Sequence, residues 1–164
     1  MKILVISDTH IPVVTNKLPY QIIQETKKAQ LCLHAGDFIS YKVFEELSSH
    51  VKVVGVRGNM DTEEVKKKLP EKEIIEVEGI RIGLIHGRGA PSSLISYIEE
   101  KFYEEIKTLN IIVFGHSHNP MIRKINNRIY FNPGSPTDKF FAPYNSYGIL
   151  NIERGNIEPQ IIRI

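Results

Sequence analysis

Five short polar clusters hold the side chains of this 164-residue chain that are best suited to chemistry. Each cluster stands where an apolar, β-rich run gives way to a turn, and the ends of strands in one sheet can converge in space. Aspartate, histidine and amide side chains together suit borderline-to-hard divalent cations. Two adjacent metal ions are a recurring arrangement for hydrolysing phosphate esters. The seven candidate ligands are Asp8, His10, Asp37, Asn59, His86, His116 and His118.

Taken singly, the first three clusters have ordinary structural explanations. Asp8 and His10 are two residues apart and would share one side of an extended segment, but a turn aspartate and a surface histidine explain them slightly better. Asp37 has two carboxylate oxygens and could bridge two cations, yet it could equally cap the next helix. Asn59 follows a glycine and on its own is best explained as a turn residue.

The last two clusters are more specific. His86 ends an apolar run abruptly, although a structural histidine explains that position about as well. His116 and His118 follow a buried run and Gly115, which clears space for close approach, so both can face one cavity. A structural explanation of this pair needs two separate reasons for histidines at one strand end. The five clusters together favour a metal site, whereas we expect His34 to be a buried, hydrogen-bonded histidine and not a ligand.

The runs between the clusters predict an α/β fold with two sheets in one domain over residues 1–164. The first third alternates apolar strands with helical patterns, which predicts a parallel sheet covered by helices; the strands are expected at 3–6, 31–33 and 51–56 and the helices at 18–29 and 40–47. The remainder predicts a partly antiparallel sheet, with hairpins over 72–85, 121–131 and 147–164, a helix from 91 towards 109 and a strand at 111–114.

Composition restricts the class of protein further. The chain is 41% hydrophobic and 24% charged, with a net charge of +2, which gives no indication of nucleic acid binding. Its one cysteine, Cys32, excludes an internal disulfide framework. The first apolar run leads directly into Ser7 and leaves no room for a signal peptide. No apolar stretch approaches the ~20 residues of a membrane span, so we expect a cytoplasmic protein.

In their order along the chain, the clusters D-x-H, G-D, G-N, H-G and G-H-x-H resemble the calcineurin-like metallophosphoesterase superfamily. The short chain, the run Leu33-His34-Ala35-Gly36-Asp37 and the later Asn132-Pro133-Gly134-Ser135 resemble its small bacterial and archaeal phosphodiesterase branch. The resemblance covers nearly the whole chain. It implies a four-layer α/β/β/α sandwich of two mixed sheets, with metal ions held at the strand ends.

The resemblance also implies which residues hold two divalent ions. One ion would be bound by Asp8, His10, Asp37 and His118, and the other by Asp37, Asn59, His86 and His116, with Asp37 bridging. Manganese is implied as the assay metal, with nickel, iron or zinc as alternatives. A hydroxide bridging the ions would attack phosphorus. Asp37, Asn59 and His118 would help to shape the catalytic site.

One position departs from the wider superfamily, in which a histidine often follows the G-N motif and protonates the leaving oxygen. Here that position is Met60, which has no proton to donate, and water, the substrate or another residue stay open as the acid. General acid catalysis is worth about 10²–10⁴-fold, so we expect esters with good leaving groups, such as aryl phosphodiesters, to react best. Arg88 is a candidate contact for substrate phosphate. Phe140, Phe141 and Tyr144 could form an apolar wall near the site, but core packing is the favoured interpretation.

The leading hypothesis is therefore a metal-dependent phosphodiesterase acting on a small substrate. A phosphomonoesterase using the same site is the first alternative. The second is a non-catalytic scaffold for protein assembly, as in the related retromer subunit; the filled ligand positions favour the enzyme. The oligomeric state is open from the sequence, and a homo-oligomer is one candidate because small members of this branch often self-associate.

Overall fold

The first sheet contains the three parallel strands expected in the first third of the chain, together with the C-terminal hairpin. In this computed structural model of residues 1–164, β1 pairs in parallel with β2, and β2 with β3, while β9 runs antiparallel to β1. The order across the sheet is β10-β9-β1-β2-β3. The bounds are β1 (Lys2–Ile6), β2 (Leu31–His34), β3 (Val53–Gly55), β9 (Ser146–Glu153) and β10 (Asn156–Arg163).

The second sheet has the order β4-β5-β6-β8-β7 and is also mixed. Strands β5, β6 and β8 are parallel, and each edge strand pairs antiparallel with its neighbour. In the β7–β8 hairpin Asn126 and Asn127 have φ values of 48° and 64°, as a two-residue type I′ turn requires. The bounds are β4 (Lys72–Val77), β5 (Ile80–Ile85), β6 (Ile111–Val113), β7 (Met121–Ile125) and β8 (Arg128–Asn132).

The helices cover the outer faces of the two sheets. Ser40 accepts a hydrogen bond from the backbone N–H of Lys42 and caps α2 as expected. The helix expected to run from 91 towards 109 is shorter: α4 ends at Lys101, where the Lys72 ammonium donates to the last carbonyl (2.8 Å) and Phe102 turns into the core. The bounds are α1 (Tyr20–Lys28), α2 (Tyr41–Ser48), α3 (Glu63–Lys68), α4 (Leu94–Lys101) and a 3-10 turn at Ile106–Thr108.

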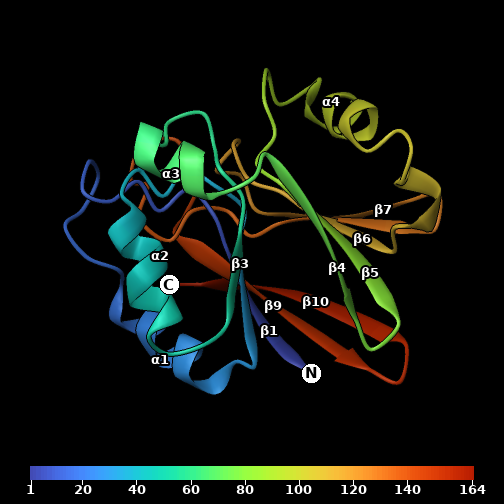
Figure 1. The fold of residues 1–164 in the computed structure, drawn as a ribbon, viewed down its shortest axis with the longest axis horizontal. Coiled ribbons are helices and arrows are strands. Elements are labelled where there is room, and N and C mark those ends of the chain that lie inside the picture. The colour runs from blue at the N-terminus through green and yellow to red at the C-terminus, as the bar shows by residue number, and fades with distance from the viewer.

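Three apolar clusters define four layers. One lies between the sheets, one joins the first sheet to α1, α2 and α3, and one joins the second sheet to α4. Figure 1 shows α1 and α2 on one side of the molecule and α4 on the opposite side. In β1, Ile3 and Val5 enter the central layer while Leu4 and Ile6 enter the helix-facing layer, which explains the continuous apolar run. The predicted α/β/β/α sandwich is confirmed, and a single domain over 1–164 stays a prediction.

The parallel strands bring the five clusters to one edge of the sandwich. The carboxyl ends of β1, β2 and β3 carry three clusters, and those of β5 and β6 carry two. Backbone hydrogen bonds join these ends within each sheet, from Asp8 N–H to the Gly36 carbonyl (3.0 Å) and from Gly115 N–H to the His86 carbonyl (3.1 Å). Carboxyl ends of parallel strands are the usual place for ligand sites in α/β proteins. None of the helices has the length and apolar character needed to cross a membrane.

Candidate metal centre

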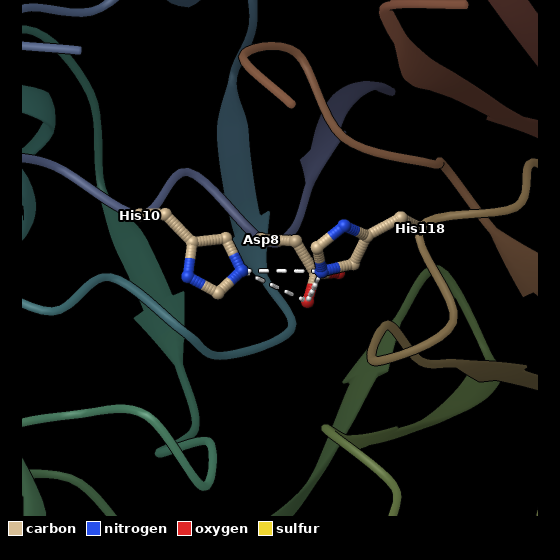
Figure 2. Close-up of side chains that lie close together, drawn as sticks. All are labelled: Asp8, His10 and His118. Carbon is tan, nitrogen blue, oxygen red and sulfur yellow. Dashed lines mark hydrogen bonds and ion pairs between the residues drawn. The ribbon is translucent and has the colours of Figure 1, made fainter. Parts of the chain in front are cut away.

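The seven predicted ligands fall into two adjoining groups. Figure 2 shows the first, in which Asp8, His10 and His118 point towards one another. Asp8 Oδ1 lies 3.3 Å from His118 Nε2 and 3.8 Å from His10 Nε2, and the two Nε2 atoms are 3.1 Å apart. Their ligand atoms lie close enough together to hold one cation. Residues 110 positions apart in the chain therefore meet at one point.

The second group contains Asp37, Asn59, His86 and His116. His86 Nε2 lies 3.3 Å from Asp37 Oδ2 and 3.2 Å from Asn59 Oδ1, and His116 Nδ1 lies 3.0 Å from the same amide oxygen. Asp37 Oδ2 is also 3.6 Å from His10 Nε2, which places this oxygen between the two groups. All seven residues predicted from the sequence thus converge.

Hydrogen bonds outside the site fix how three of the histidines face into it. His86 Nδ1 lies 2.7 Å from the Ala35 carbonyl, and His116 Nε2 lies 2.9 Å from the Gly89 carbonyl. His118 Nδ1 contacts the carboxylate of Asp138. Each of these nitrogens faces an acceptor and therefore carries a proton. In the neutral ring, the other nitrogen then presents a lone pair to oxygen acceptors inside the site.

An arrangement of acceptors facing acceptors is stable only when protons or cations lie between them. The second nitrogens of His86 and His116 both face Asn59 Oδ1, and that of His118 faces Asp8. The facing lone pairs are satisfied by protons between these groups, by an Asn59 amide turned with its NH₂ towards the rings, or by divalent metal ions. Histidines whose outer nitrogen is held by a carbonyl or carboxylate are typical of metal sites. The donor set therefore fits divalent cations.

Charges in the metal-free site follow the same logic. Burial alone would raise the pKa of Asp8, but hydrogen bonds from His10 and His118 and the charge on His86 lower it far below its usual range. Burial opposes protonation of His86, yet the hydrogen bond to Asp37 and the charge of Asp8 raise its pKa to about 9. Burial is likewise outweighed at His118, where Asp8 and Asp138 raise the pKa to about 9. Two protonated histidines therefore offset the buried carboxylates when no cation is bound.

The backbone at the ligands is unusual. Five of the seven ligand positions have positive φ: Asp8 (55°), His10 (46°), Asp37 (57°), His116 (69°) and His118 (54°). The extended segment expected at Asp8 and His10 is therefore wrong, and left-handed backbone turns these two side chains towards each other. Non-glycine residues in this region cost free energy and cluster at functional sites.

Two glycines of the motifs are required by close approach. A Cβ at Gly58 would lie 2.1 Å from Asp37 Oδ1, and one at Gly115 would lie 1.8 Å from the hydroxyl of Ser7. Both would displace buried groups beside the ligands. Because neither position has a positive φ, the need for glycine here is one of space.

Asp61 holds the loops that carry Asp37 and Asn59. Its carboxylate accepts N–H bonds from Asp37 (3.2 Å), Ile39 (2.7 Å) and Gly58 (2.7 Å). Of the two roles open to Asp61 in the sequence, helix cap or orienting group, the structure shows the second, since Thr62 is the first boundary residue of α3.

His34 is buried as expected. Gly36 N–H donates to its Nδ1 (3.2 Å), so Nε2 carries the proton and donates to the Thr9 hydroxyl (3.1 Å). Burial lowers the pKa of His34 to about 3, so the ring is neutral. It ties the β1 and β2 loops together from outside the ligand cluster.

Sequence reasoning missed Asp138 and the loop that carries it. Asp138 is 3% exposed, and its carboxylate contacts His118 Nδ1 while accepting N–H bonds from Phe140 (2.8 Å), Phe141 (3.1 Å) and Ala142 (3.0 Å). The small number of aspartates in the chain is a signal that could have drawn attention to Asp138. The chain has four aspartates among its 19 acidic residues, and all four are buried at this site.

A cavity of about 350 Å³ opens over the ligand cluster. Five of the seven ligand candidates line it, together with Met60, Pro91 and Phe141. Phe140 and Phe141 are 85% and 81% exposed, so the expected core packing of these rings is wrong. Tyr144 packs instead against the Arg163 guanidinium. A neighbouring cavity beyond Asn59 and His86 is lined by Arg57, Arg88 and Tyr97 among others, which places Arg88 beside the cluster.

A four-layer sandwich that gathers seven candidate oxygen and nitrogen ligands at its strand ends is an α/β protein with a candidate metal centre. The model of the calcineurin-like phosphoesterase superfamily domain matches residues 1–155, and the chain belongs to this family. A probable metallophosphoesterase of Methanothermobacter thermautotrophicus is 34% identical, over 99% of this chain and 92% of the relative. A Thermotoga maritima protein solved by NMR is 31% identical, with a TM-score of 0.78 over 99% of both chains.

Two further solved structures share the fold at lower identity. Zinc-complexed Vps29 of Entamoeba histolytica is 22% identical, with a TM-score of 0.77 over 99% of both chains. A protein described as a novel archaeal phosphodiesterase is 20% identical, with a TM-score of 0.74 over 99% of this chain and all of that chain. At these identities the likeness concerns the fold alone.

Proposed function

We propose that this protein is a metal-dependent phosphodiesterase with two divalent ions in the ligand cluster. The observation that carries the proposal is the orientation of His86, His116 and His118. Each commits one ring nitrogen to an acceptor outside the site and presents the other to oxygen acceptors within it. Family membership gives the class of reaction, phosphoester hydrolysis.

In the proposed assignment one ion is held by Asp8, His10, Asp37 and His118. The other is held by Asp37, Asn59, His86 and His116. Asp37 would be the residue shared between the two ions: its Oδ2 lies 3.6 Å from His10 Nε2 and 3.3 Å from His86 Nε2, whereas its Oδ1 accepts the Met60 N–H at 2.8 Å.

Two divalent ions supply an activated water and neutralise charge on the phosphoryl oxygens. The chain's own residues determine where that chemistry takes place. Asp37 links the two groups, Asn59 adds a neutral oxygen that limits repulsion between carboxylates, and His118 is held by Asp138 facing Asp8. Asp61 and the glycine turns fix the loops so that little reorganisation is needed during reaction.

The chemistry of the cavity supports a diester over a monoester. No lysine or arginine is among the residues lining the space above the ligands. A monoester dianion carries one more charge than a diester, and arginine is the usual partner for it. Arg57 and Arg88 lie in the neighbouring cavity, so a monoester that reached them is the second candidate.

The test is a panel of metals and substrates on purified protein and the Asp37→Asn variant. We expect manganese-supported hydrolysis of bis-p-nitrophenyl phosphate that exceeds hydrolysis of p-nitrophenyl phosphate, with nickel, iron and zinc compared alongside. Asp37→Asn should abolish turnover while the protein stays folded, and Glu76→Gln, an exposed strand position, should leave turnover unchanged. Undiminished activity in Asp37→Asn refutes the bridge, and faster monoester turnover refutes the diester assignment.

A scaffold without catalysis is the remaining alternative, and it predicts that no added metal supports turnover. Manganese as the assay metal, self-association and a cytoplasmic location stay predictions. Size measurements in solution test the second of these directly.

A further inference from the structure

The cavity over the ligand cluster has one apolar side that the proposed chemistry does not use. Phe141 and Met60 line it together with Pro91, and both side chains are largely exposed, at 81% and 55%. Large apolar side chains grouped around a cavity in this way mark a surface that meets another molecule. The cavity is continuous with His10, Asp37 and His118, so whatever contacts Phe141 also lies beside the ligands.

Phe141 is held in place although its ring is exposed. Its backbone N–H donates to Asp138 Oδ2 (3.1 Å), and the flanking N–H groups of Phe140 and Ala142 donate to the same carboxylate. The ring stands edge-on to His118 with the ring centres 6.2 Å apart. One buried carboxylate therefore fixes both a predicted metal ligand and the aromatic wall next to it.

Met60 limits the same space from the second loop. Its backbone N–H donates to Asp37 Oδ1 (2.8 Å), which anchors the residue while its thioether remains free to adjust. Thioethers make favourable contacts with aromatic rings and adapt to their shape. A flat ring bound in this cavity would have Met60 and Phe141 among its walls and would meet no lysine or arginine there.

We infer that Phe141 and Met60 form a subsite for a planar aromatic substituent of the phosphoester, an aryl group or a nucleobase. This inference rests on the proposed function and names its substrate class. Aromatic rings stack on one another with a preference of about 2- to 12-fold in affinity. Phe141 is accordingly a residue that determines specificity, and Phe140, equally exposed but absent from the cavity lining, is not.

The test measures binding and does not need turnover. Phenylphosphonate and methylphosphonate are titrated by calorimetry into manganese-loaded wild type, Phe141→Ala and Phe140→Ala. Wild type should prefer the phenyl compound. Phe141→Ala should reduce that preference by about 2- to 12-fold, and Phe140→Ala should keep it. Both rings are exposed, so neither change opens a core cavity, and equal melting temperatures verify this.

Thymidine 5′-monophosphate against deoxyribose 5-phosphate gives the nucleobase arm. If Phe141→Ala loses only the preference for phenylphosphonate over methylphosphonate, the subsite binds an aryl group. If it loses the preference for thymidine 5′-monophosphate over deoxyribose 5-phosphate, the subsite binds a nucleobase. An unchanged preference in Phe141→Ala, or an equal loss in Phe140→Ala, overturns the inference. The inference is also overturned if Phe141→Ala and Phe140→Ala both shift the protein from oligomer to monomer while the phenyl preference is unchanged. The two rings would then contact a second copy of the chain.

Failure of the subsite and failure of the proposed function give different results. Turnover of bis-p-nitrophenyl phosphate by wild type with no phenyl preference sinks the subsite alone. Phenyl preference that depends on Phe141 without any turnover keeps the subsite and sinks the hydrolase.

Discussion

Replacing Asp138 by asparagine changes one oxygen of a buried carboxylate to an amide and removes its charge. The carboxylate now serves four donors: His118 Nδ1 and the N–H groups of Phe140, Phe141 and Ala142. An asparagine that keeps its oxygen towards His118 must turn its NH₂ towards the Phe140 N–H, which sets donor against donor. Turned the other way, it sets NH₂ against His118. In the first orientation His118 keeps a hydrogen bond that is no longer charge-assisted, and the loop that carries it loses the Phe140 bond. In the second, His118 loses the hydrogen bond itself.

The expected consequence is weaker metal binding. Residues that hold a ligating histidine through its outer nitrogen are typically worth 10- to 100-fold in metal affinity. That range corresponds to about 1.4–2.7 kcal/mol, because each 1.4 kcal/mol is tenfold. The burial of Asp138 and its direct contact with His118 place it within this range. Competition with a chelator of known affinity measures the change for manganese and for zinc.

Asn145→Ala provides a matched control. Its amide donates to the carbonyls of Ser135 (3.3 Å) and Asp138, so it supports the same loop without contacting His118. We expect Asn145→Ala to lower the melting temperature of the metal-free protein while keeping its metal affinity. Equal affinity in Asp138→Asn and wild type would refute the reasoning. An equal loss in Asn145→Ala would show that loop rigidity, and not the carboxylate, is responsible.

Four further predictions concern protons and space. The pKa values of His86 and His118 are raised from about 6.5 to about 9. Their protonation therefore stabilises the metal-free protein fully below pH 6.5, and this stabilisation is lost as the pH rises through 9. Melting temperatures measured from pH 6 to 10 should show this fall. Metal must displace those protons, so calorimetry in buffers of different ionisation enthalpy should reveal proton release, and no buffer dependence contradicts it. Met60→His should raise turnover of esters with poor leaving groups, relative to turnover of bis-p-nitrophenyl phosphate, by up to about 10²-fold. Equal effects on both substrates exclude acid catalysis. Gly115→Ala should abolish metal binding and cost about 1–3 kcal/mol of stability. Gly79→Ala is the control: nothing lies within 4 Å of its added Cβ, so it should affect stability alone. Intact metal binding in Gly115→Ala argues against the close approach.

The sequence was sufficient to predict most helices and strands and the convergence of the candidate ligands, because burial imposes a regular pattern of apolar residues. Ile3 to Ile6 is apolar throughout since β1 is covered on both faces, and the hairpin at Asn126 and Asn127 follows from their tolerance of positive φ. Convergence of the ligands then follows from parallel strands ending at one edge. Helix ends were less certain, as at Phe102, where a tertiary contact stops α4 before its sequence pattern ends.

The missed features share a cause: they depend on contacts between distant residues. Asp138 meets His118 across 20 positions, with no motif linking them. The exposure of Phe140 and Phe141 contradicts the usual burial of aromatic rings, because their loop is fixed by the Asp138 carboxylate and not by apolar packing. Left-handed backbone at Asp8 and His10 is likewise imposed by the neighbouring loops.

The absent proton donor and the apolar wall constrain the substrate together. Met60 provides no proton, which favours a departing oxygen that is stable as an anion, as an aryl oxide is and a sugar alkoxide is not. An aryl group can therefore occupy the Met60–Phe141 subsite as the leaving group. A nucleobase can occupy it only when its sugar is the retained substituent and another, better group departs. The two occupants thus predict different effects of Phe141→Ala on thymidine 5′-p-nitrophenyl phosphate. With a nucleobase in the subsite, the variant reduces turnover of this diester more than that of methyl p-nitrophenyl phosphate. With an aryl leaving group there, it reduces turnover of both diesters equally.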